Sequence, residues 1–326
     1  WLGMPGMHGT VTANKAITEC DLILAAGIRF DDRVTGKVST FAKQATIVHI
    51  DIDPAEISKL VEAHVPVVGD LKDVLPRLEQ DLKRLEIENW WKTLNDWKTN
   101  YPERFNTEGK TLGSQEVIRM FYEATGGNCV VTTEVGQHQM FAARLFPTQK
   151  ARTWITSGGL GTMGFGLPAS IGAAFARPGE TVVCIAGDGS IQMNIQELAT
   201  LYKHQLPVVI AICNNGHLGM VRQWQEMFHH ERFSEVMLAD SNPDFAKLAE
   251  AYGIEGHNVF DRETAKKLIP ELLAKGKPAV VNFVVYESEK VFPMIPSGAG
   301  VDEMIIGDQE PEFDYNSDVY GEKELA

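Results

Sequence analysis

Two oxygen-bearing side chains follow two neighbouring apolar runs of the sequence, and their types and spacing indicate a metal site. Asp188 comes directly after "TVVCIAG", and Asn215 ends "PVVIAICNN", with an amphipathic stretch between the two runs. Parallel strands joined by a helix have their carboxyl ends at the same edge of a sheet, so the carboxylate and the amide can converge there. Such hard oxygen ligands suit Mg²⁺, whose octahedron phosphates and water complete.

The residues around Asp188 add a phosphate site to this metal site. Gly187 and Gly189 allow a ligand to approach the backbone closely, and the helix expected after Ser190 offers its N-terminal N–H groups to an anion. A backbone carbonyl from the loop after Asn215 can serve as a further ligand. The sequence therefore predicts a clamp for magnesium and a diphosphate.

Simpler explanations compete for the same residues. Asp-Gly alone commonly marks a turn. An EF-hand loop that begins at Asp188 is disfavoured, because its glycine position would hold Met193 and its bidentate acid position Ala199. The spacing of "GDG" at 187–189 and Asn214-Asn215, by contrast, resembles the GDG…NN signature of thiamine diphosphate enzymes.

A second glycine pattern, "GGLGTMGFG", has the spacing of a dinucleotide-binding motif at Gly159, Gly161 and Gly164. No clean strand precedes it, so that motif is weak. Pro168 fits the first turn of a following helix, and the glycines are better explained by a tight turn with close packing. Met163 would then be unusually exposed, although core filling is the simplest role of a methionine.

Composition limits the class of protein. The 326 residues provide for roughly two domains of about 150 residues. No apolar run approaches the ~20 residues that span a bilayer. The net charge is −14 with scattered acids, which argues against nucleic acid. We expect a soluble globular protein with neither membrane nor nucleic-acid partners.

The cysteines and the first residue of the sequence indicate the cellular compartment of the protein. The four cysteines are far apart and form no CxxC pair, so we expect reduced thiols and a reducing compartment: Cys20, Cys129, Cys184 and Cys213. No signal peptide precedes Trp1, which predicts a natural start elsewhere and a cytoplasmic protein, or a plastid one in a eukaryote.

Strands alternate with helices along two stretches, which predicts an α/β fold of parallel sheets flanked by helices. The first domain, 1–85, has strands over "DLILAAG", "ATIVHIDID" and "VPVVGD", a helix from Pro54 and a helix over 71–85. A connecting helix and linker occupy 86–113. The tail at 307–326 is acidic, and we expect it to be loose or to lie on a surface.

The second domain, 114–306, contains a longer series of the same kind. Helices are predicted from Ser114 to Ala124 and over "LPASIGAAFA", "NIQELATLYKH" and "DFAKLAEAYG". Strands are predicted over "CVVTTEV", "RTWITS", "TVVCIAG", "PVVIAICNN" and "AVVNFVVY".

Several longer motifs identify a family. The stretches "TTEVGQHQM", "SGGLGTMGFGLPA", "GDGSIQMN", "NNGHLGMVRQW" and "FPMIPSGAGVDEM" resemble the large catalytic subunit of acetolactate synthase (acetohydroxyacid synthase). Upstream, "GMHGT", "RFDDRVTG" and "HIDIDP" resemble the FAD-binding middle domain of that family. The resemblance covers nearly the whole chain, and it implies a thiamine diphosphate-binding fold plus a partial FAD-binding domain.

The resemblance assigns cofactor roles to residues of the second domain. Mg²⁺ would be held by Asp188, Asn215 and the backbone carbonyl of His217. Thiamine diphosphate would contact Gly136, Gln137, His138, Gly161, Met163, Gly187, Asp188, Gly189, Ser190, Asn215, His217, Leu218, Gly219 and Met220.

Three residues would act in catalysis. Met163 would hold the cofactor in its bent conformation. Trp224, about one helical turn after Met220, is by itself more simply a core residue, but in this family it shapes the pocket for the second 2-keto acid. Arg33, otherwise an ordinary solvated charge, would meet that substrate's carboxylate with its forked guanidinium.

The first domain would bind FAD, which is largely structural in this family. Asp53 before Pro54, with Glu56 after it, reads as a helix N-cap, which leaves Asp51 free for a ribose hydroxyl. The residues implied are Gly6, Met7, His8, Gly27, Arg29, Asp31, Asp32, Arg33, Asp51, Ile52, Asp70 and Leu71.

The implied reaction is decarboxylation of pyruvate and addition of the two-carbon unit to a second pyruvate or to 2-ketobutyrate, the first common step of branched-chain amino-acid synthesis. A homodimer or higher oligomer and a small regulatory subunit are implied partners. Alternatives are a pyruvate oxidase, a glyoxylate carboligase or a non-catalytic binding module. Family members also carry an N-terminal pyrimidine-binding domain with an activating glutamate that has no counterpart in 1–326, so we expect this chain alone to be inactive or nearly so.

Overall fold

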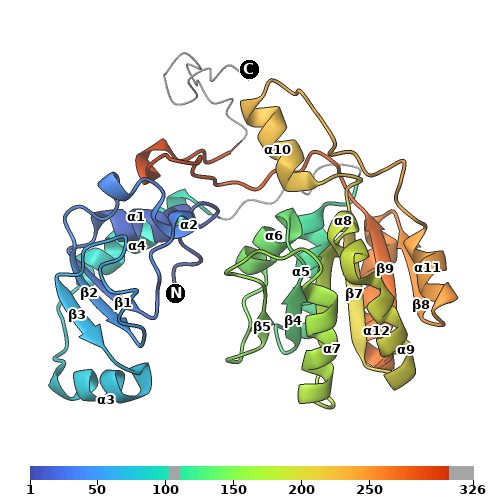
Figure 1. Ribbon diagram of the computed structural model, residues 1–326, viewed down its shortest axis with the longest axis horizontal. Coiled ribbons are helices and arrows are strands. Elements are labelled where there is room, and N and C mark those ends of the chain that lie inside the picture. The colour runs from blue at the N-terminus through green and yellow to red at the C-terminus, as the bar shows by residue number, and fades with distance from the viewer. Residues whose placement is uncertain (103–110, 308–326) are drawn as a thin grey trace.

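The computed structural model describes residues 1–102 and 111–307 as two lobes, each built on a parallel sheet (Figure 1). This confirms the expected α/β class. The predicted tail lies outside the described residues beyond Gly307, and so does part of the predicted linker.

The N-terminal lobe contains three parallel strands in the order β1-β2-β3, and all three were predicted: β1 (Leu22–Ala26), β2 (Thr46–Asp51) and β3 (Val65–Val68). A small core of Ala25, Phe30, Ile47 and Val61 lies beneath them. The helical elements of this lobe are α1 (Val11–Glu19), α2 (Asp32–Thr35), the 3-10 turn η1 (Val38–Thr40) and α3 (Leu71–Asp81).

The helix predicted from Pro54 is wrong, because residues 54–58 form turns. Asp51 Oδ1 accepts from the backbone N–H of Asp53 at 2.9 Å, and Asp53 Oδ1 accepts from that of Ala55 at 2.9 Å. These side chains bond locally to the backbone and so favour turns over a helix. Asp53 is therefore not a helix N-cap, and one oxygen of Asp51 is already engaged.

The predicted connecting helix is present as α4 (Glu88–Asn100), and it packs against α1. The rings of Trp90 and Trp97 meet edge to face at 5.6 Å, and Lys15 of α1 lies over the Trp97 ring at 5.2 Å. This contact fastens the connection to the N-terminal lobe.

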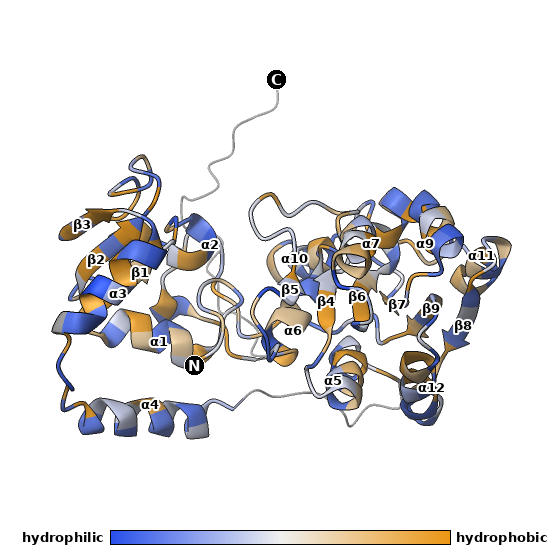
Figure 2. Ribbon diagram, turned by 90° about the horizontal axis from the view of Figure 1, so that it is seen from below, coloured by the Kyte–Doolittle hydropathy of each residue, from blue (hydrophilic) through white to orange (hydrophobic). Residues whose placement is uncertain are grey.

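The C-terminal lobe contains six parallel strands in the order β5-β4-β6-β7-β9-β8. The strands are β4 (Val130–Thr133), β5 (Trp154–Ile155), β6 (Val182–Gly187), β7 (Val208–Asn214), β8 (Glu255–Val259) and β9 (Ala279–Val284). Only β8 was not predicted, because "EGHNV" has no apolar run. Figure 2 shows β8 as hydrophilic and β6 as hydrophobic.

Alternate residues of the central strands enter two separate cores, as burial on both faces requires. Val183 and Ile185 pack with helices α5 (Ser114–Thr125), α6 (Gln137–Leu145) and α12 (Arg262–Lys275). Val182 and Cys184 pack with α7 (Gly166–Ala176), α9 (Leu198–His204) and α11 (Phe245–Ala251). The four cysteines are free thiols, and Cys129, Cys184 and Cys213 are buried as expected.

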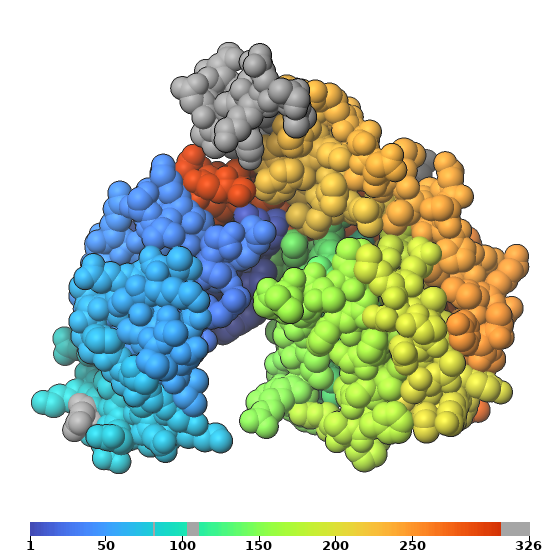
Figure 3. All heavy atoms as spheres, viewed as in Figure 1, coloured from blue at the N-terminus to red at the C-terminus, as the bar shows by residue number. Residues whose placement is uncertain are grey.

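A crossing segment after β9 connects the two lobes (Figure 1). The Ile295 N–H donates to the Met7 carbonyl at 2.8 Å, and the Lys37 N–H donates to the Ala299 carbonyl at 2.9 Å. The 3-10 turn η3 (Val301–Glu303) follows. Figure 3 shows the opening that remains between the lobes. Every helix in the described part of the chain is too short or too polar to span a bilayer.

Candidate active site

The register of the central strands brings the predicted metal ligands to one edge of the sheet. Gly187 at the end of β6 pairs with Cys213 in β7, so Asp188 and Asn215 leave the sheet side by side. Asp188 begins the short helix α8 (Asp188–Ile191), which continues as the 3-10 turn η2 (Gln192–Glu197). Both side chains line a cavity of about 930 Å³ to which both lobes contribute.

Most of the residues expected to bind thiamine diphosphate meet in this cavity. Gly161 is not among the lining residues and instead forms part of a turn with Ser157. The others that line it are Gly136, Gln137, His138, Met163, Gly187, Asp188, Gly189, Ser190, Asn215, His217, Leu218, Gly219 and Met220, together with Trp224 and Arg33.

Asp188 is a buried carboxylate with 2% of its surface exposed, and among the described residues no lysine or arginine acts on it, although His217 is close enough to do so. Burial raises its pKa to about 6, although a hydrogen bond from Asn242 partly opposes the rise. Asn242 Nδ2 donates to Asp188 Oδ2 at 2.7 Å. A bound divalent cation would favour the ionised form of this group.

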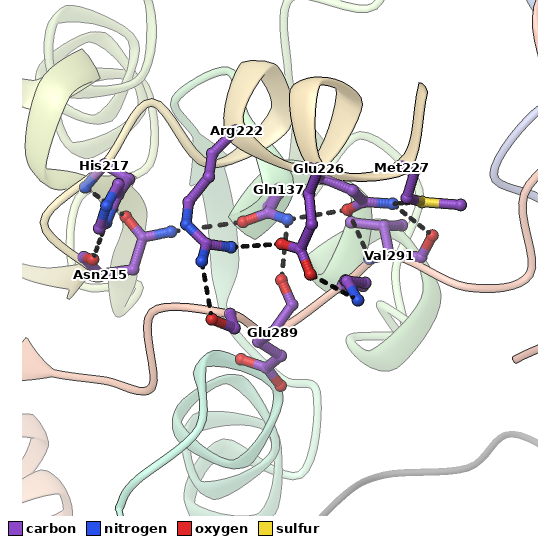
Figure 4. A network of polar contacts seen from close by, with 11 residues as sticks. Gln137, Asn215, His217, Arg222, Glu226, Met227, Glu289 and Val291 are labelled. Carbon is purple, nitrogen blue, oxygen red and sulfur yellow. Dashed lines mark hydrogen bonds and ion pairs between the residues drawn. The ribbon is translucent and has the colours of Figure 1, made fainter. Parts of the chain in front are cut away.

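Asn215 and His217 form a compact loop beside Asp188. The His217 N–H donates to Asn215 Oδ1 at 3.1 Å, and Asn215 Nδ2 donates to Gln137 Oε1 at 3.3 Å (Figure 4). No cluster of three or more His, Cys, Asp or Glu side chains able to hold a metal occurs within residues 1–102 and 111–307. The donors at this edge are therefore one carboxylate with amide and carbonyl oxygens, a set that suits Mg²⁺ rather than a softer metal.

Glycines shape the floor of the cavity where a phosphate would approach. A Cβ atom on Gly187 would lie 2.7 Å from Cε1 of His138, and one on Gly189 would lie 2.9 Å from Cδ1 of Leu238. His138 is 7% exposed, and its Nε2 has no hydrogen-bond partner among the described residues. Burial lowers the pKa of His138 to about 3, so the ring is neutral and a polar ligand would satisfy Nε2.

A buried glutamate fixes the turn that carries Met163, and the sequence motifs gave no separate sign of it. Glu134 Oε2 accepts from the Gly164 N–H at 2.6 Å, and Oε1 accepts from the Leu167 N–H at 2.9 Å. Burial raises the pKa of Glu134, while these backbone donors at the start of α7 oppose the rise. Pro168 lies in the first turn of α7, as predicted.

Helix α10 (Gly219–Phe228) brings Met220 and Trp224 to the cavity, and a polar network anchors it (Figure 4). Gln223 Oε1 accepts from Gln137 Nε2 at 2.9 Å and from the Val291 N–H at 2.9 Å. Arg222 donates to Glu226 at 2.6 Å and to Ser288 at 2.9 Å. α6, α10 and the start of the crossing segment thus form one wall.

The N-terminal lobe contributes the opposite wall. Arg33 and His8 line the cavity, and the Met7 N–H donates to the Arg33 carbonyl at 2.7 Å. Burial, with smaller effects of Arg144 and Arg33, lowers the pKa of His8 to about 4. Its Nδ1 has no hydrogen-bond partner among the described residues.

The other residues expected to bind FAD are grouped at the carboxyl edge of the small sheet, where ligands of α/β folds bind. Several already have local partners: Arg29 contacts Asp31 at 2.6 Å, and Asp70 caps α3 by accepting from the Lys72 N–H at 2.9 Å. Asp31 Oδ1 is buried with no hydrogen-bond partner among the described residues, so a ligand hydroxyl would fit it. The remaining members of this group are Gly27, Asp32, Asp51, Ile52 and Leu71.

Comparison with known proteins agrees with this geometry. The model of the thiamine pyrophosphate enzyme C-terminal TPP binding domain matches residues 134–283, and that of the central domain matches 1–78. The chain is 46% identical over 305 residues to the acetolactate synthase isozyme 2 large subunit of Escherichia coli, which covers 94% of this chain and 55% of that protein. It is 45% identical over 316 residues to the chloroplastic acetolactate synthase 1 of Nicotiana tabacum, and the match covers 93% of this chain and 47% of that protein.

The chain thus spans about half the length of the curated relatives that it matches. The matched residues 1–78 lie in the N-terminal lobe and the matched residues 134–283 lie in the C-terminal lobe. Asp188 and Asn215, at the ends of β6 and β7, lie within the match to the TPP binding domain. This chain therefore belongs to the thiamine pyrophosphate enzyme family: it contains the central and the C-terminal TPP binding domains and is homologous to acetolactate synthase large subunits.

Proposed function

We propose that this protein joins two 2-keto acids with loss of CO₂. Two pyruvates would give 2-acetolactate and CO₂, and pyruvate with 2-ketobutyrate would give 2-aceto-2-hydroxybutyrate and CO₂, a step toward branched-chain amino acids. The observation that carries the proposal is the cavity where Asp188, Asn215, Met163 and Trp224 meet Arg33 of the other lobe. The names and identity of the relatives support it.

Thiamine diphosphate, when bound, supplies the electron sink that decarboxylation of a 2-keto acid requires. Asp188, Asn215 and the backbone carbonyl of His217 are the groups that would hold Mg²⁺, which would bind the diphosphate. Gly187 and Gly189 allow the diphosphate to approach the backbone. Neutral His138 offers a buried ring nitrogen as a donor or acceptor to the same ligand.

The remaining wall residues orient the substrates. Met163, held by the turn that Glu134 fixes, would contact the cofactor. Trp224 gives the acceptor 2-keto acid an apolar surface and excludes water from it. The Arg33 side chain is 66% exposed and its contact with Asp32 is long, at 3.4 Å, so that the guanidinium is available to a substrate carboxylate.

FAD and protein partners belong to the same proposal. The carboxyl edge of the small sheet, with the buried Asp31 oxygen, supports binding of FAD in a structural role. The Escherichia coli relatives are named large subunits, which supports a small-subunit partner for this protein. We also propose a homodimer or higher oligomer.

Product analysis tests the proposed reaction. The protein as its gene encodes it is incubated with pyruvate, thiamine diphosphate, Mg²⁺ and FAD. Acetolactate with one CO₂ per two pyruvates is expected. Acetate or acetyl phosphate would instead indicate a pyruvate oxidase, and no product would contradict the proposal.

A further inference from the structure

Asn242 lies between the two strand ends that form the proposed metal clamp. Its Nδ2 donates to Asp188 Oδ2 at 2.7 Å and lies 3.4 Å from Asn214 Oδ1. Its Oδ1 accepts from Gln192 Nε2 at 3.0 Å, and the same nitrogen donates to the Asp188 carbonyl at 2.9 Å. Contacts at both its nitrogen and its oxygen thus fix the orientation of the Asn242 amide, with the NH₂ group toward Asp188.

Backbone bonds hold Asn242 in this place. Its N–H donates to the Leu238 carbonyl at 2.8 Å, and the Leu238 N–H donates to the Gly216 carbonyl at 2.7 Å. The segment that carries Asn242 is therefore tied to the loop that contains Asn215 and His217. Movement of one would displace the other.

The choice of an amide has a physical reason. Asp188 is almost fully buried, and a buried carboxylate requires hydrogen-bond donors. A lysine or arginine would supply a charge that competes with a cation, whereas an amide donates one hydrogen bond and stays neutral. Asn242 engages the carboxylate at Oδ2 alone, which leaves other lone pairs of Asp188 to a metal. Partners of this kind fix the orientation of metal ligands, and their loss typically weakens metal binding about 10–100-fold.

We propose that Asn242 is a positioning residue that orients the Asp188 carboxylate for Mg²⁺, with Gln192 fixing the orientation of the amide. This inference rests on the proposed magnesium–diphosphate clamp. Asn242 does not line the cavity and is not a ligand itself. Its effect is on metal affinity.

The test is a titration of Mg²⁺ at fixed thiamine diphosphate, with cofactor binding followed by calorimetry on the full-length protein. Asn242→Ala is expected to raise the Mg²⁺ concentration for half-maximal binding about 10–100-fold. Gln192→Ala is expected to raise it less, and it tests the same contact should Asn242→Ala not fold.

Asn258→Ala is the matched control. Asn258 Nδ2 donates to Asp244 at 2.9 Å and its Oδ1 accepts from Asn282 at 2.8 Å, the same pattern of contacts away from the cavity. Its Mg²⁺ dependence should match that of the unaltered protein. A role in folding alone would lower the melting temperature of both asparagine variants without moving the Mg²⁺ dependence of either, and that result would overturn the inference.

Asp188→Ala separates this inference from the proposed clamp. If Asp188→Ala loses Mg²⁺-dependent binding while Asn242→Ala and Gln192→Ala keep it unchanged, the clamp stands and the role of Asn242 is wrong. If Asp188→Ala also binds normally, the clamp itself is wrong.

Discussion

The two sheets of this protein use the same architecture with different degrees of enclosure. In the larger sheet every residue of β6 is buried, because helices cover both faces. In the small sheet Leu22, Leu24, Val65 and Val68 remain exposed. Each sheet has its proposed cofactor residues at the carboxyl edge of parallel strands.

The polar groups at the two edges differ accordingly. At the small sheet Asp51 and Asp70 accept from nearby backbone N–H groups, and Asp31 Oδ1 is the one oxygen of this group that is buried with no hydrogen-bond partner among the described residues. At the larger sheet Asp188 is buried with no lysine or arginine acting on it among the described residues, and His138 has a ring nitrogen with no hydrogen-bond partner there. The structure therefore supports a bound ligand more strongly at the larger sheet than at the small one.

The largest expected effect tests how tightly the larger lobe is packed. A Cβ on Gly166 would lie 2.5 Å from the Glu134 backbone nitrogen and 2.6 Å from the Thr133 carbonyl carbon, which cannot move aside. Gly166→Ala should destabilise the lobe by about 3 kcal/mol. Gly172→Ala in the same helix meets nothing within 4 Å and should be neutral or slightly stabilising. Equal thermal midpoints for the two variants would refute this packing.

A pH effect of intermediate size is expected where the lobes meet. Burial lowers the pKa of His8 from 6.5 to about 4, so between these values the unfolded chain binds a proton that the folded chain does not. Stability should therefore fall as pH drops from about 7 to 4, by on the order of 2–3 kcal/mol from this residue.

Thermal midpoints measured across this pH range without cofactors check the expectation. His8→Gln should make the profile less steep, and a pH dependence should remain because buried His138, whose pKa is lowered to about 3, contributes over the same range. His204→Gln, at the exposed end of α9, is the matched control. An equally steep profile in His8→Gln would rule out His8 as the source.

The smallest effect compares two helix caps, one in each lobe. Asp70 caps α3 and Asp261 caps α12, each by accepting a backbone N–H at 2.9 Å. Replacing either with Ala should lower stability slightly and reduce hydrogen-exchange protection in its own helix. Only Asp70→Ala should also lower the flavin content measured by absorbance. Equal flavin contents in the two variants would exclude Asp70 from the FAD site.

The sequence predicts the larger sheet well because its central strands are continuous apolar runs with glycine or asparagine at their ends. The sequence does not predict β8, because "EGHNV" at the edge of the sheet is polar, and it does not predict α12. It also fails at Pro54, where Asp51 and Asp53 bond to nearby backbone and favour turns. Local side-chain hydrogen bonds outweighed the helical pattern there.

The sequence likewise predicts some residues of the candidate site and misses others. Motif spacing brings Asp188 and Asn215 together because adjacent parallel strands fix their positions. Glu134, Gln223 and Asn242 were missed, since their contacts join loops and helices far apart in the chain and leave no periodic pattern. The pairing of Asn242 with Asp188 spans 54 residues and is visible only in the fold.

Direct binding of thiamine diphosphate tests the central claim, that the edge between β6 and β7 is a magnesium–diphosphate clamp. Calorimetry on the full-length protein should show binding that requires Mg²⁺. Asp188→Ala should abolish it, while Asp244→Ala, a helix cap away from the cavity, should retain it. Unchanged Mg²⁺-dependent binding in Asp188→Ala would contradict the account.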